Sequence, residues 1–124
     1  MMVGWICSSV TPYYNSETKH MDYKKRPVLI IGDLINNDYT VLPISTVSKR
    51  ENLHPIYDIK ADPLYYPRLR LNKVSFIRVH KQTTVHKASV TSTISNLKNE
   101  YPDLYSTVLT KLSEYNKHLM KKAE

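Results

Sequence analysis

The sequence is poor in cysteine and has no long hydrophobic run. Cys7 is the only cysteine among 124 residues, so no internal disulfide can form, and no group of Cys and His residues has the spacing of a metal site. The longest aliphatic run, residues 28–31, is far too short to span a membrane. Residues 1–10 lack the basic start and longer apolar stretch of a secretion signal. We therefore expect a cytoplasmic protein with no membrane segment, no metal and no cofactor, in which Cys7 is a small core residue.

Acidic residues are absent from residues 67–99, although the chain contains 11 of them elsewhere. The same segment carries Arg68, Arg70, Lys73, Arg78, Lys81, Lys87 and Lys98. The remaining basic residues equal the acidic ones in number, so the formal net charge of +7 comes from this segment. A concentrated basic segment favours a polyanionic partner, because binding releases counterions condensed on a nucleic acid. A surface charge that serves only solubility is the alternative.

The chain is long enough for one domain, which we assign to residues 1–124. Hydrophobic residues make up 41% of it, enough for a core. Local patterns predict strands at 3–10, 27–31, 39–46, 54–59, 73–82 and within 83–97. Five or six short strands before a final helix indicate a mainly β (α+β) protein, a small bent antiparallel sheet or barrel with a C-terminal helix packed on it.

Three segments outside the strands carry their own signals. Residues 11–25 predict a long polar loop, since turn formers and charges dominate them. Residues 32–33 and 36–38 predict a hairpin turn, and Pro43 predicts an edge or a bulge in the strand that returns from it. Apolar residues recurring every three or four positions predict a helix over 102–120, with Pro102 in its first turn.

Residues 73–82 predict a strand with Arg78 and His80 on one face, since side chains two apart point the same way and lie ~6–7 Å apart. A fixed cation then sits beside a group that exchanges protons near neutral pH. That pairing suits phosphodiester chemistry. An Arg-x-His pair is also common on the solvated face of a purely structural strand, so both interpretations stay open at this point.

Several short motifs follow one another in a recognisable order: Gly4-Trp5-Ile6, then Arg26-Pro27 before an aliphatic run, then Pro43-Ile44-Ser45-Thr46, then residues 77–85. This order resembles the MazF/PemK (Kid) toxins of bacterial toxin–antitoxin systems over most of the chain. The resemblance implies a small SH3-like barrel of the CcdB/MazF type that forms a homodimer. It also implies an endoribonuclease that cleaves single-stranded RNA without a metal and is neutralised by a cognate antitoxin.

In the mechanism that the resemblance implies, a ribose 2′-hydroxyl attacks the adjacent phosphorus. The reaction needs a base, an acid and cations for the developing charge. Arg26 matches the first motif arginine and would stabilise the phosphorane. Ser45 and Thr46 match the hydroxyl pair that would hold a phosphate. Arg78 matches the second motif arginine.

His80 stands where the Kid-type pattern has an aspartate, two residues after the arginine. An imidazole with a pKa near ~6.5 exchanges protons readily at pH 7, and a neighbouring Arg78 favours its neutral form, which suits a general base. The same departure is equally expected of a diverged, inactive member.

Further contacts with RNA are expected from residues near these motifs: His20, Lys24, Lys25, Lys73, Lys81 and Thr83. His20 precedes Arg26 by six positions, as a histidine does in Kid, and is either a second proton-transfer group or simply solvated. Tyrosines at 13, 14, 65 and 66 could stack on unpaired bases or pack structurally.

Two other functions remain open. One is a gyrase-inhibiting toxin like CcdB, which shares the implied fold; the Arg26-Pro27 and Ser45-Thr46 motifs argue against it. The other is a non-catalytic RNA-binding SH3-like barrel that uses only the basic segment.

Overall fold

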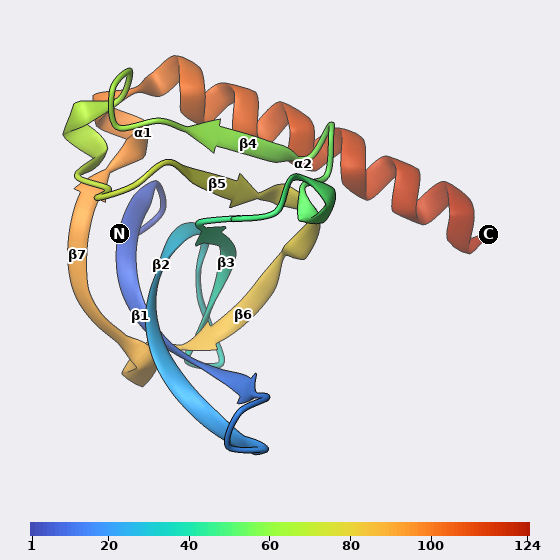
Figure 1. The fold of residues 1–124 in the computed structure, drawn as a ribbon. Coiled ribbons are helices and arrows are strands. Elements are labelled where there is room, and N and C mark those ends of the chain that lie inside the picture. Colours follow the sequence, from blue (N-terminus) through green and yellow to red (C-terminus); the bar gives the residue numbers. More distant parts are fainter.

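A curled antiparallel sheet and one long helix make up the computed structural model, which describes residues 1–124 (Figure 1). The strands are β1 (Trp5–Asn15), β2 (His20–Ile35), β3 (Asp38–Ser45), β4 (Asp58–Ala61), β5 (Ser75–Arg78), β6 (Thr83–His86) and β7 (Val90–Asn96). They pair in the order β4-β5-β3-β2-β1-β7, and β6 pairs with β3 as well. The helices are α1 (Leu97–Glu100) and α2 (Pro102–Ala123), with short 3₁₀ turns at Arg50–Asn52, Pro67–Leu69, Val79–Lys81 and Lys87–Ser89. The prediction of a mainly β, barrel-like sheet with a C-terminal helix is confirmed.

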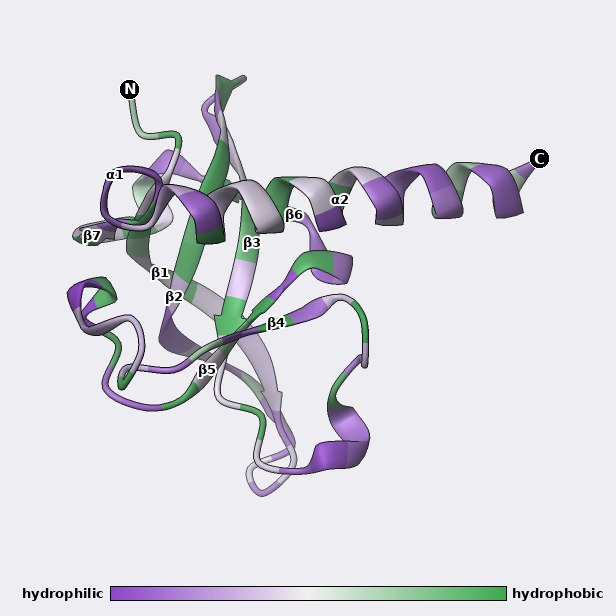
Figure 2. Ribbon diagram, turned by 90° about the horizontal axis from the view of Figure 1, so that it is seen from above, coloured by the Kyte–Doolittle hydropathy of each residue, from purple (hydrophilic) through white to green (hydrophobic).

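The middle of β2 is buried on both faces, as its unbroken aliphatic run predicts. Leu29 belongs to a large cluster that includes residues of β3, β5 and α2. Its neighbours Val28 and Ile30 point the other way and pack in a smaller cluster with Cys7 and Val41. Cys7 is a buried core residue, as predicted. Figure 2 shows the hydrophobic stretches gathered where β1, β2 and β3 lie side by side.

Residues 11–25 form an arm of two long strands, so the prediction of an irregular loop is wrong. Each residue from Thr11 to Asn15 on β1 faces a partner on β2, down to the pair Asn15 and His20. The Asn15 side chain accepts from the backbone N–H groups of Glu17 and Thr18 and closes the turn. The arm projects away from α2 (Figure 1). Backbone pairing holds its two strands together. The sequence of the arm therefore needs no hydrophobic alternation, and the strands could not be predicted from it.

The strand predicted over 73–82 is shorter than expected and ends at Arg78. Residues Val79–Lys81 form a 3₁₀ turn, in which the Val79 N–H donates to the Tyr57 carbonyl at 3.0 Å. The Val79 side chain is fully buried in the large cluster that also holds residues of α2. The alternation of buried and half-exposed side chains therefore continues into the turn, although the strand itself ends at Arg78. Arg78 and His80 lie close together as predicted, since both contact the Asp58 Oδ1, at 3.0 and 3.7 Å.

Three other boundaries differ from the sequence prediction. The strand expected at 54–59 starts at Asp58, because the His54 Nδ1 accepts from the N–H groups of Ile56 and Tyr57 and holds a turn there. Residues 83–97 give two strands instead of one. The hairpin turn consists of Asn36 and Asn37, both with positive φ, whereas residues 32–33 lie inside β2.

Pro43 lies where β3 changes its partner. Residues 38–41 of β3 pair with β6, and Ile44 and Ser45 pair with β5. Pro43 falls between the two sets and pairs only with β2. A residue without an N–H donor is tolerated in such an interruption. Of the predicted edge or bulge, the structure has a local edge, since Pro43 has no partner on that side of β3.

The predicted helix is confirmed as α2 and extends three residues further than expected, to Ala123. Leu104, Tyr105 and Val108 in its first turns are buried against the sheet. Its later turns extend beyond the sheet and are largely hydrophilic (Figure 2). None of the helices is long and apolar enough to cross a lipid bilayer.

Candidate anion-binding site

Two adjoining hollows at one end of the sheet share Arg26, Ser45 and Thr46. The first, of about 340 Å³, is also lined by Val47, Ser48, Asn52, Arg78 and Lys81. The second, of about 260 Å³, is also lined by Lys24, Lys25, Pro27, Ile44 and Ser75. We call the two together the Arg26 hollow. It brings together four of the five residues predicted to be catalytic and three of those predicted to contact RNA.

Strand register explains why these residues meet. The β2–β3 ladder pairs Val28 with Pro43, and the same register continued by two residues places Arg26 beside Ser45. On the other side of β3, Ser45 pairs with Phe76 of β5, the strand that ends at Arg78. The pairing of three antiparallel strands therefore makes neighbours of Arg26, Ser45 and Arg78, which lie far apart in the sequence.

The Arg26 hollow is lined by cations and hydroxyl groups, and no carboxylate or histidine lines it. Arg26 takes part in no ion pair. Its Cζ lies 5.9 Å from the centre of the Tyr13 ring, in a cation–π contact. An unpaired guanidinium can bind two oxygens of a phosphate at once. The hollow is therefore suited to an anion with several oxygens.

Arg78 binds the carboxylate of Asp58, a residue that the sequence analysis did not identify. Its Nε donates to the Asp58 Oδ1 at 3.0 Å, and its Nη2 donates to the Asp58 Oδ2 at 3.2 Å. Nη2 also donates to the Asn52 carbonyl at 2.9 Å. The Asp58 side chain is only 1% exposed. Asp58 lies opposite Arg78 in the β4–β5 ladder, a pairing that only the strand register could have disclosed.

His80 lines a different hollow, of about 540 Å³, between the Val79–Lys81 turn and α2. Its neighbours there are His54, Ile56, Tyr57, Tyr115, His118, Leu119 and Lys122. The His80 ring centre is 5.1 Å from that of His54, and its Nδ1 is 3.7 Å from the Asp58 Oδ1. The link between His80 and the Arg26 hollow therefore passes through Asp58 and Arg78.

The environment of His80 keeps its imidazole neutral. Burial lowers its pKa below the ordinary value, and the charges of Arg78, His54 and Lys81 act in the same direction, while Asp58 opposes them. The prediction that Arg78 favours the neutral form is confirmed in direction, although burial contributes more. At neutral pH the 3.7 Å contact with Asp58 is accordingly not an ion pair.

The other predicted RNA contacts lie outside the Arg26 hollow. His20 pairs with Asn15 at the end of the arm, and six residues of extended strand separate it from Arg26 by about 20 Å. Lys73 and Thr83 line neither part of the hollow. The basic segment 67–99 is also divided, because Arg68 and Arg70 line a separate hollow beside Trp5. Of its cations, only Arg78 and Lys81 reach the Arg26 hollow.

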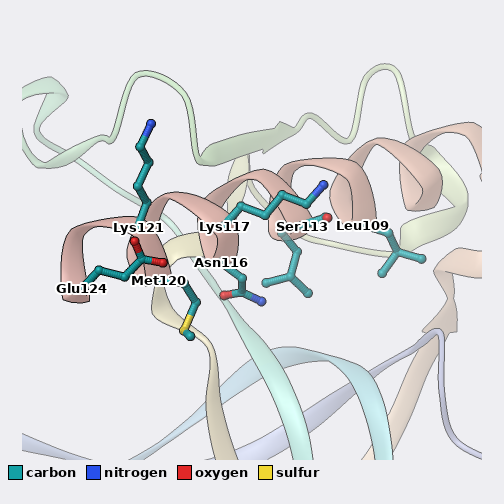
Figure 3. A pocket seen from close by; sticks show the side chains of 8 residues that line it. Leu109, Ser113, Asn116, Lys117, Met120, Lys121 and Glu124 are labelled. Carbon is teal, nitrogen blue, oxygen red and sulfur yellow. The ribbon is translucent and has the colours of Figure 1, made fainter.

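Another hollow, of about 800 Å³, lies along one face of α2 (Figure 3). All its lining residues come from this one helix: Leu109, Leu112, Ser113, Asn116, Lys117, Met120, Lys121 and Glu124. A single helix face offers no set of polar groups that converge on a small ligand. It provides apolar surface and does not compete with the Arg26 hollow as a catalytic site.

Replacing His80 with Gln is expected to reduce the pH dependence of stability. Because the folded-state pKa of His80 is lowered, its contribution is present above the unfolded value of ~6.5 and is lost as pH falls through the folded value. Urea unfolding of both proteins between about pH 7.5 and pH 5 measures this. The wild-type protein should lose more free energy of unfolding than His80→Gln over that interval. Equal losses would contradict the assignment.

The half-barrel sheet thus places a cationic, hydroxyl-lined hollow suited to a phosphate group where three of its strands pair. Residues 10–114 match the model of the PemK-like, MazF-like toxins of type II toxin–antitoxin systems. The chain belongs to this family, whose members are generally endoribonucleases. The resemblance inferred from the sequence motifs is thereby confirmed. A comparison with curated proteins gives no significant match.

Proposed function

We propose that this protein is a toxin endoribonuclease that cleaves single-stranded RNA, messenger RNA in particular, by metal-independent attack of a ribose 2′-hydroxyl. The observation that carries the proposal is the Arg26 hollow, where Arg26 and Arg78 flank the hydroxyl pair Ser45 and Thr46. A phosphodiester placed there meets two guanidinium groups and two hydroxyl donors. These are the groups that a phosphorane with growing negative charge requires.

Each residue has a role in this proposal. Arg26 and Arg78 stabilise the charge on the phosphorane, and Ser45 and Thr46 hold the scissile phosphate or its neighbour. His80 is the general base, since its neutral imidazole can accept the proton of the 2′-hydroxyl as the P–O5′ bond breaks. The leaving 5′ oxygen takes its proton from a water molecule. To reach the hydroxyl it must turn from its own hollow toward Arg78, to which it is linked through Asp58.

The RNA chain is proposed to continue from the hollow across neighbouring cations. Lys24, Lys25 and Lys81 line the hollow and bind adjacent phosphates. His20, Lys73 and Thr83 lie outside it and contact more distant nucleotides. Such contacts make binding weaker as salt concentration rises.

The proposed protein partners are a second copy of this chain and an antitoxin. The active form is a homodimer in the cytoplasm, and a cognate antitoxin neutralises it. Leu109, Leu119 and Met120 of α2 are exposed large apolar side chains, and such a surface favours coverage by a protein partner.

The purified protein is expected to cleave single-stranded messenger RNA in EDTA, because the proposed charge stabilisation comes from protein side chains. Gel analysis of the RNA with and without EDTA measures this, with His80→Ala run alongside. Full activity of His80→Ala would remove His80 from the chemistry.

Salt-sensitive RNA binding without cleavage would instead indicate a non-catalytic RNA-binding barrel. Inhibition of gyrase supercoiling would indicate a CcdB-like toxin.

A further inference from the structure

Asp58 is a buried carboxylate beside the Arg26 hollow, and the proposed function gives it no direct contact with RNA. Both of its oxygens are occupied. Oδ1 accepts from the Arg78 Nε, and Oδ2 accepts from the Arg78 Nη2 and from the His54 backbone N–H at 2.8 Å. With its side chain 1% exposed, Asp58 is not available to the solvent or to a substrate. Whatever it does for catalysis passes through Arg78 or His80.

The contacts of Arg78 leave one edge of its guanidinium unoccupied. Nε and Nη2 bind the Asp58 carboxylate, and Nη2 also binds the Asn52 carbonyl. Nη1 makes no hydrogen bond, and Arg78 lines the Arg26 hollow. The side chain is 13% exposed. Three hydrogen bonds and burial together therefore restrict the rotation of its planar guanidinium group, which we call the Arg78 fork.

We propose that Asp58 is a positioning residue, which fixes the Arg78 fork so that Nη1 is the donor presented to the substrate phosphate. This inference rests on the proposed function. Because Asp58 and Arg78 face each other on paired strands, the backbone sets their separation and the fork is already oriented before RNA binds. Preorganised donors stabilise a transition state without reorganising during the reaction.

A purely structural ion pair explains these contacts less well. Replacing a buried ion pair with apolar residues is often neutral for stability or even stabilising. The pair here stands at the edge of the hollow, and its cation lines the hollow while its anion does not. That asymmetry is what a positioning role requires, since the carboxylate would weaken phosphate binding if it faced the hollow itself.

The test compares Asp58→Asn, Arg78→Lys and the double variant with the wild-type protein. Asn keeps the shape of the side chain and an acceptor oxygen but cannot bind the fork through two anionic oxygens. Single-turnover cleavage gives the rate and the apparent RNA affinity separately, and thermal unfolding reports the folded fraction. Glu100→Gln is the matched control, because it removes a carboxylate from the exposed Arg68–Glu100 pair, which lines a separate hollow.

We expect Asp58→Asn to slow cleavage by about a hundredfold, since small misplacements of a catalytic group have effects of that size, with little change in RNA affinity. In the Arg78→Lys background, where no fork remains to be positioned, the same change should have little further effect. Glu100→Gln should cleave at the wild-type rate. A wild-type rate for Asp58→Asn, or an equal loss in both backgrounds, would overturn the proposal.

A spectroscopic readout separates this inference from the proposed function. In the wild-type protein the Arg78 Nε–H is buried against Asp58 and should give a slowly exchanging ¹H–¹⁵N signal, which Asp58→Asn should lose. If the wild-type protein cleaves no RNA in any condition, the proposed function fails and the catalytic role of Asp58 is overturned with it. Cleavage with an unchanged Nε–H signal in Asp58→Asn would overturn the positioning role alone.

Discussion

Replacing Arg26 with Ala is expected to lower the rate of RNA cleavage by about 10²–10³-fold, the effect of removing one preorganised donor from a developing oxyanion. Arg26 lines both parts of the hollow and has no carboxylate partner. Its whole guanidinium is therefore available to the phosphate. The fold should be unaffected, because the side chain is not part of either hydrophobic cluster. Initial cleavage rates and urea unfolding of the same preparations measure the two effects.

Two variants control for charge and geometry at Arg26. Arg68→Ala also removes one positive charge, but from a separate hollow, and should retain nearly full activity. Arg26→Lys keeps the charge and loses the planar fork, so its rate should lie between those of wild type and Arg26→Ala. Full activity in Arg26→Ala would exclude this residue from the chemistry.

Replacing Arg78 with Ala is expected to lower both cleavage and stability. It leaves the Asp58 carboxylate, 1% exposed, without its cation, and breaking a buried pair from one side costs about 3–5 kcal/mol of unfolding free energy. Arg26→Ala leaves no buried charge and should cost much less. Urea unfolding therefore distinguishes the two arginines even where both variants are inactive.

The double variant Arg78→Met with Asp58→Asn separates stability from activity. It removes the unpaired buried charge, so part of the lost stability should return. Cleavage should not return, because Nη1 of Arg78 is still missing. Recovery of cleavage in the double variant would show that Arg78 acts only through the fold.

The elements with local signals were predictable from the sequence, and those that depend on pairing were not. The aliphatic run at residues 28–31 predicts the buried centre of β2, and the periodicity after Pro102 predicts α2, because burial leaves a recognisable pattern. The arm at 11–25 left none, since two polar strands stabilise each other through backbone hydrogen bonds. The end of β5 depends on the 3₁₀ turn at Val79–Lys81, which the local alternation does not reveal.

In the candidate site, too, residues within motifs were predictable and a residue placed only by strand pairing was not. Arg26, Ser45, Thr46 and Arg78 were predicted from short motifs, and the structure places them around one hollow. Asp58 carries no motif, and its relation to Arg78 exists only through the β4–β5 register.

The hollow that His80 lines was not predictable from the local pattern. Strand alternation correctly placed His80 close to Arg78, since both contact Asp58, but the 3₁₀ turn directs it into a hollow with His54 and Tyr115.

The chemistry of the product ends tests the central claim most directly. A short single-stranded RNA containing one cleaved sequence is incubated with the protein in EDTA, and both products are analysed by mass spectrometry. Attack by the 2′-hydroxyl predicts a 2′,3′-cyclic phosphate on one fragment and a 5′-hydroxyl on the other, and no cleavage when that nucleotide is 2′-deoxy. A 5′-phosphate end, or cleavage of the 2′-deoxy substrate, would contradict the account.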